Sequence, residues 1–141
     1  MIIIERARSW IGVITAYSMD SAAQGPHCTD CSGFLWRVLG KPKNQGGLWW
    51  NTDRIYGDAT GAQVQFERID APEVGCIAVY GRRQNRGNAG HVAIVIDPAA
   101  RTIIDCSSSQ NGVHVHDGGY WWRHAGAVWC RYKGTIPETV P

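Results

Sequence analysis

The hydrophobic pattern of this chain changes its period part-way along, and this change limits the folds open to it. In residues 3–14 and again in residues 31–39, apolar side chains recur at every third or fourth position, as on one face of an α-helix. From residue 64 onward, apolar and polar residues alternate as they do in half-buried β-strands. Helices followed by an antiparallel sheet are typical of the α+β class, which we therefore expect.

The helical part contains two strong segments and one short one. We expect a first helix from Ile3 to Ile14 and a second from Cys31 to Leu39, capped at its start by Thr29 or Asp30. A short third helix is expected around residues 51–56. Four strands are expected over residues 64–69, 76–80, 91–96 and 102–106, and residues 112–116 and 127–132 could add two more.

Length and composition restrict the class of protein. The chain has 141 residues, enough for one domain over residues 1–141, and no apolar run reaches the roughly 20 residues of a membrane helix. The net charge of +2 is too weak to indicate nucleic acid as a partner. Charged residues follow Met1 to Ile4 at once, so we expect a protein made in the cytoplasm without a signal peptide.

Three residues could form the site of a cysteine hydrolase. Cys31 stands at the start of the second expected helix, where a helix N-terminus and a nearby imidazole favour a thiolate. His91 opens a strand, and alternation places Asp105 of the next strand close to it if the two strands pair as a hairpin. Cys31 would then be the nucleophile, His91 the base and Asp105 the group that orients the imidazole. No metal or other cofactor is required.

Other interpretations of these residues remain open. A cysteine at a helix start is often a buried apolar side chain, and Cys28 with Cys31 also reads as C-x-x-C, half of a zinc site or a redox pair. The chain has five cysteines, so at least one stays free if disulfides form; the others could form up to two bridges or stay reduced. Remote candidates to complete a zinc site are Cys76, Cys106, His114 and His116.

Two motifs in this chain resemble those of the NlpC family of papain-like cell-wall peptidases. The first is D-C-S-G-F, at residues 30–34, and the second is G-H-V-x-I-x-I, at residues 90–96. The family's third signature is a polar residue in the following strand, usually histidine. Here it is Asp105, a departure from the family pattern, although related CHAP enzymes use an acid or an amide at this point.

The resemblance implies a papain-like fold, with N-terminal helices packed on a central antiparallel sheet. It also implies a peptidoglycan hydrolase whose partner is a stem peptide, with Tyr17, Asp30 and Ser32 near the free amine of that peptide. His116 is the reserve for the third catalytic role. The expected reaction is endopeptidase cleavage between D-glutamate and the diamino acid; the alternative is a CHAP-like N-acetylmuramoyl-L-alanine amidase.

The resemblance leaves the setting and two rival classes open. A phage particle, cell lysis or a secretion machine would deliver the enzyme to the periplasm or cell wall, and a virion component, the secretion machine or an immunity protein would be its protein partner. A non-catalytic wall-binding or virion structural protein, or an acyltransferase, could keep the same motifs. Further candidates for substrate contact are Arg82, Arg83, Arg86 and the pairs Trp49-Trp50 and Trp121-Trp122.

Overall fold

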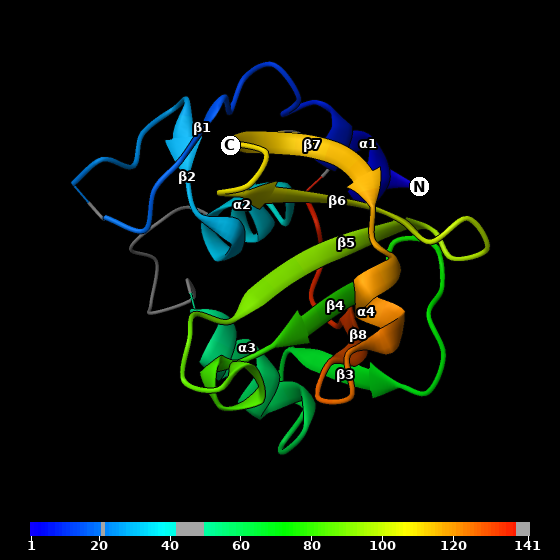
Figure 1. Cartoon of the computed structure of the whole chain (residues 1–141). Helices are drawn as coiled ribbons and strands as arrows, with labels where there is room; N and C mark the ends of the chain where they lie inside the picture. The colour runs from blue at the N-terminus through cyan, green and yellow to red at the C-terminus, as the bar shows by residue number, and fades with distance from the viewer. Residues whose placement is uncertain (21, 42–49, 138–141) are drawn as a thin grey trace.

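A six-stranded antiparallel sheet forms the centre of the molecule in the computed structural model, which describes residues 1–20, 22–41 and 50–137. The spatial order of the strands is β3-β8-β4-β5-β6-β7, and Figure 1 shows them from β7 at the top to β3 at the bottom. The α+β class is thereby confirmed. The strands are β3 (Phe66–Ile69), β4 (Ile77–Tyr80), β5 (His91–Asp97), β6 (Thr102–Ser107), β7 (Gly112–Asp117) and β8 (Val128–Tyr132).

Three helices pack against one face of this sheet. They are α1 (Ile2–Arg8), α2 (Cys31–Val38) and α3 (Thr52–Ala59). The central helix α2 buries Phe34, Leu35, Trp36 and Val38 among apolar residues of β4, β5 and β6. Burial of four large side chains on one short helix fixes α2, and therefore Cys31 at its first turn, against the sheet.

The other face of the sheet carries a smaller apolar cluster. Helix α4 (Gly119–Arg123) contributes Trp121, which is 1% exposed and packs with Tyr80, Ala93 and Val95. Because alternate residues of a strand point to opposite faces, β5 supplies Val92, Ile94 and Ile96 to the first cluster and Ala93 and Val95 to this one. Both faces of β5 are therefore covered.

The first helix is shorter than expected. It ends at Arg8 rather than at Ile14, and turns follow. Gly12 has a φ of +80°, a conformation that glycine adopts readily and that ends the helical path. Ile14 is buried beyond this turn, and its carbonyl accepts a hydrogen bond from the backbone N–H of Val113 in β7. The apolar spacing thus reflects burial of Ile14 by the turn rather than by a continuous helix.

Short elements that have no clear periodicity complete the fold. Strands β1 (Ala16–Tyr17) and β2 (Cys28–Thr29) form a parallel pair, and the 3-10 helix η1 (Arg82–Asn85) follows β4. The β1–β2 pair comes just before α2, and η1 lies in the segment between β4 and β5. All five cysteines are free thiols, and four of them are buried. None of the helices in the described ranges is long and apolar enough to cross a membrane.

Candidate active site

Cys31 is the first residue of α2, and its position depends on the cap that precedes it. Oδ1 of Asp30 accepts a hydrogen bond of 2.8 Å from the backbone N–H of Gly33, as an N-cap residue does. A Cβ on Gly33 would lie 2.1 Å from Oγ1 of Thr29, so this turn requires glycine. The first N–H groups of a helix have no acceptor within the helix, and Cys31 lies at this end of α2.

His91 is the first residue of β5, where the strand meets Tyr80 of β4. Its imidazole stacks on Trp121 with the ring centroids 5.8 Å apart. Gly90, just before it, has no room for a side chain, since a Cβ would lie 2.5 Å from the carbonyl oxygen of Tyr80. The Gly-His pair of the motif therefore has a physical reason: glycine allows close packing, and the histidine ring is then held between strand and helix.

Asp105 joins His91 from the neighbouring strand β6. Oδ2 of Asp105 lies 2.6 Å from Nε2 of His91, and the Asp105 side chain is only 1% exposed. Burial works to raise the pKa of Asp105, but hydrogen bonds from His116 and His91 lower it overall. The carboxylate therefore stays ionised inside the protein.

The His91 ring is held in its charged form by its neighbours. Burial works to lower its pKa, but hydrogen bonds to Asp105 and to the Cys31 thiol, together with the charges of both groups, raise the pKa of His91 to about 10. Because Nε2 of His91 faces Asp105, Nδ1 is the atom left for Cys31. A thiol, an imidazole and a carboxylate thus lie in sequence, the arrangement that nucleophilic catalysis by cysteine needs.

Two cavities adjoin this row of side chains. One, of about 260 Å³, is lined by Asp30, Cys31 and Ser32 of the α2 start and by residues of α3. The other, of about 310 Å³, is lined by His91 and Asp105 and by residues of β7 and α4. Three residues line both cavities, so the two meet beside the thiol and imidazole: Tyr17, Ala89 and Gly90.

The sequence matches the family described as bacteriophage peptidoglycan hydrolase over residues 3–136. The chain belongs to this family. The crystal structure of the NlpC/p60 domain of peptidoglycan hydrolase SagA is similar in fold, with a TM-score of 0.55 and 18% sequence identity over 92% of this chain and 94% of that one. The papain-like NlpC fold and the peptidoglycan hydrolase class are therefore confirmed. No curated protein matches this hydrolase by sequence.

The predicted amine-binding residues of this hydrolase lie together in the cavity on the Cys31 side. Tyr17 in β1 is half-buried, and burial followed by the nearby Cys31 and Asp30 raises the pKa of its phenol, so it stays neutral. Oγ of Ser32 lies 3.4 Å from Oδ1 of Asp30. The structure thus brings all three to the nucleophile, while their role in binding stays a prediction.

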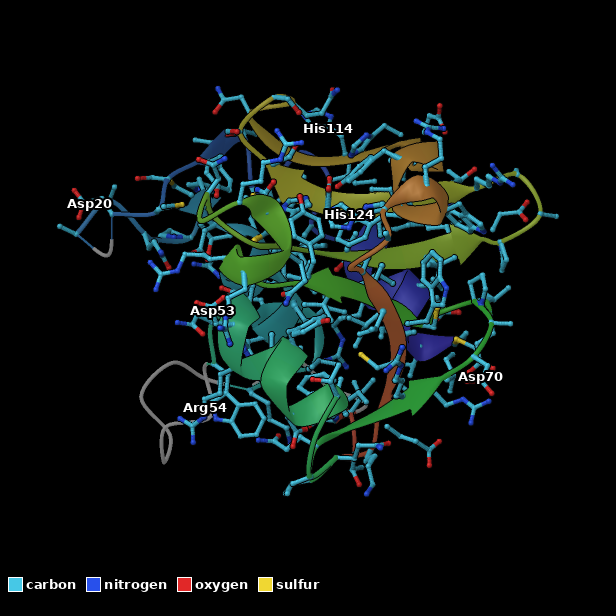
Figure 2. All side chains as sticks on the ribbon, turned by 60° about the horizontal axis from the view of Figure 1, so that its bottom comes forward. Asp20, Asp53, Arg54, Asp70, His114 and His124 are labelled. Carbon is cyan, nitrogen blue, oxygen red and sulfur yellow. The ribbon has the colours of Figure 1, made fainter. Side chains whose placement is uncertain are left out.

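The three arginine candidates for substrate contact differ in their position relative to the nucleophile. Arg82 lines the cavity on the Cys31 side, and its guanidinium pairs with Asp53 of α3 at 3.1 Å. Asp53 is the second residue of α3 and is labelled in Figure 2. Arg83 and Arg86 are exposed and do not line either cavity beside the nucleophile.

The tryptophan pairs have separate surroundings. Trp121 is buried beneath His91, and Trp122 packs against Trp129. Trp50 packs edge-on against Trp36 of the core. Trp49 lies outside the described residues.

Sequence reasoning did not find several residues around His91. Tyr80 and Tyr120 line the His91 cavity, and their hydroxyls interact. The alternation of β4 could have indicated Tyr80, which ends its strand beside His91, but the short helix α4 carries no periodic signal. His116, the reserve for the third role, contacts Asp105 rather than His91. Among the described residues, no three His, Cys, Asp or Glu side chains converge to hold a metal ion.

Proposed function

We propose that this peptidoglycan hydrolase cleaves an amide bond of the stem peptide by thiol catalysis through Cys31, His91 and Asp105. The observation that supports this most is the continuous set of contacts from Asp105 through His91 to Cys31, placed where two cavities meet. A substrate that occupies both cavities would place its scissile bond beside the Cys31 thiol.

The reaction has two stages. Sγ of Cys31 attacks the carbonyl carbon, backbone N–H groups at the start of α2 stabilise the oxyanion, and the amine leaves with a proton from His91. His91 then removes a proton from water, which attacks the thioester and releases Cys31 as a thiolate and the product as a carboxylic acid. Asp105 keeps the imidazole oriented and stabilises its positive charge during both stages.

The bond that we favour joins D-glutamate to the diamino acid. The cavity on the Cys31 side is lined by Asp30 and Tyr17, and by Asp53, whose carboxylate pairs with Arg82. A cluster of this kind suits the ammonium group of L-alanine at the free end of a stem peptide, the residue just before the D-glutamate that carries the scissile carbonyl. Only an endopeptidase substrate released from the glycan has this free amine.

A second candidate is hydrolysis between muramic acid and L-alanine. It is favoured by the acidic Asp105 in the third position, which resembles the CHAP pattern rather than the usual histidine of the NlpC family. In this case the glycan would occupy one cavity. For either bond, we propose delivery to the wall by a phage particle or by lysis, with a virion component as protein partner. A bacterial secretion machine with an immunity protein is the alternative.

Mass spectrometry of products from defined substrates tests the choice of bond. We expect the free tetrapeptide to yield the L-Ala-D-Glu dipeptide, and the same peptide acetylated at its amine to react at least about tenfold more slowly, since an ion-pair contact is lost. Release of a disaccharide from a disaccharide-tetrapeptide would instead assign the amidase. Binding of the substrate without release of products would favour a structural protein. Products joined to added amines would favour an acyltransferase.

A further inference from the structure

Asp105 contacts a second histidine, on the side away from the nucleophile. Oδ1 of Asp105 lies 2.6 Å from Nε2 of His116 in β7, while Oδ2 lies 2.6 Å from Nε2 of His91. Each oxygen of this buried carboxylate therefore has its own imidazole. The two distances are equal, so Asp105 is held from both sides.

The strand register places these three residues together. Asp105 lies opposite His114 in the β6–β7 pairing, so His116 is its diagonal neighbour two residues along. The β5–β6 pairing of Ile94 with Ile104 leaves His91 in the equivalent diagonal position on the other side. Long side chains reach across such diagonals, so the sheet itself builds the His91–Asp105–His116 row.

We propose that His116 is a positioning residue of this hydrolase, which fixes the Asp105 carboxylate so that Oδ2 stays directed at His91. This inference rests on the proposed function of Cys31, His91 and Asp105. A carboxylate held at one oxygen can rotate about its Cβ–Cγ bond, whereas two hydrogen bonds at opposite oxygens fix its plane. Loss of the His116 contact would also leave a buried acceptor, Oδ1, without its partner.

His116 also brings a titratable charge to the row. Its hydrogen bond to Asp105 raises the pKa of His116 above the usual histidine value, although burial opposes the shift and the charge of His91 works against it. Whenever His116 is protonated, its positive charge favours the Cys31 thiolate, and a neutral replacement removes that charge. The groups facing His116 are Asp105 of β6, His91 of β5, Asp117 of its own strand and the cavity phenols Tyr17, Tyr80 and Tyr120.

Two substitutions separate the hydrogen bond from the charge. His116→Gln retains an N–H donor near the position of Nε2 but cannot be protonated, and His116→Ala removes both. We expect His116→Ala to lower kcat about 10- to 100-fold with little change in KM, and His116→Gln to restore kcat to within about threefold of wild type. The control is His114→Ala, since His114 is exposed on the same strand and is labelled in Figure 2.

A second measurement needs no wall substrate. The rate of iodoacetamide alkylation of Cys31 is followed against pH in a Cys28→Ala background, because Cys28 is the one cysteine that is not buried and Cys31, at 5% exposed, is the most accessible of the other four. Both His116 variants should move the midpoint of this profile to higher pH, and His114→Ala should not. If wild type fails to cleave peptidoglycan while this shift is observed, the proposed function fails and the coupling of His116 to the thiol stands.

Two results would overturn the inference. One is a His116→Ala enzyme with wild-type kcat and an unchanged alkylation midpoint. The other is a His116→Ala protein in which fewer molecules are alkylated but the active ones keep the wild-type kcat and midpoint, which would indicate only a structural role. A His116→Gln enzyme as slow as His116→Ala would likewise rule out the hydrogen bond as the cause.

Discussion

A carboxylate that is 1% exposed, such as that of Asp105, needs compensation for its lost hydration. Its two imidazole partners supply that compensation, and they also explain why the carboxylate stays ionised within an otherwise apolar sheet. The same contacts orient the His91 ring, with Nε2–H directed at Asp105 and Nδ1 facing the thiol. At the scale of single residues, the same two hydrogen bonds therefore stabilise the buried Asp105 carboxylate and orient it for the proposed chemistry.

Replacement of Asp105 tests its role in orienting His91. We expect Asp105→Asn to lower kcat about 100-fold or more, because its amide offers one oxygen where the carboxylate offers two and so favours the wrong tautomer of His91. Turnover of soluble stem peptide and thermal unfolding are measured together. Asp70→Asn is the control, since Asp70 is exposed and distant (Figure 2). Unchanged turnover in a folded Asp105→Asn protein would assign the orienting role to another residue.

At the scale of elements, the first turn of α2 carries both the nucleophile and the cap that positions it. Gly33 lies at the centre of this turn, where its Cβ position is occupied by Thr29 and Asp30. Gly57, in the interior of α3, has open space around its Cβ position. These two glycines therefore form a matched pair for substitution.

We expect opposite effects of alanine at these two positions. Gly33→Ala should lower the free energy of unfolding by about 1–3 kcal/mol through the clash, and lower kcat because Cys31 shifts. Gly57→Ala should raise the free energy of unfolding by about 0.5–1 kcal/mol, the usual gain for a helix interior. Urea unfolding curves measure both. A Gly33→Ala protein as stable as wild type would show that the turn does not need glycine.

The elements that sequence reasoning found are those with a periodic signal. The strands and α2 lie within a few residues of their expected positions, because each has one face in the core. Helix α4 has only five residues, and β1 and β2 have two residues each, so none of them is long enough to show a period. In the site, motifs identified Cys31 and His91. The contact of His116 with Asp105 depends on strand register, which apolar alternation does not specify.

At the scale of the whole molecule, the histidine–carboxylate row couples stability to pH. The pKa values of His91 and His116 are raised above the unfolded value of 6.5, so the stability they contribute is fully present below pH 6.5 and is lost as the pH rises through each folded pKa, which for His91 is about 10. The pKa of Asp105 is lowered, so its contribution is present above the unfolded value of 3.8 and is lost as the pH falls below it.

The expected result is a stability maximum in weak acid. The free energy of unfolding should fall by about 2 kcal/mol between pH 6.5 and 8.5, because the unfolded state releases protons that the folded state retains. Urea unfolding at a series of pH values measures it, and Asp105→Asn should flatten the curve. A wild-type protein whose stability is constant or rises over this interval would contradict the charge assignment.

Catalysis by this hydrolase, as proposed, depends on Cys31 as the nucleophile. The most direct measurement is the release of peptide fragments from purified sacculi, detected by mass spectrometry, by wild type, Cys31→Ala and Cys28→Ala. We expect wild type and Cys28→Ala to release fragments at similar rates, and Cys31→Ala to release none above background while remaining folded. Digestion by Cys31→Ala at the wild-type rate would contradict thiol catalysis at this site.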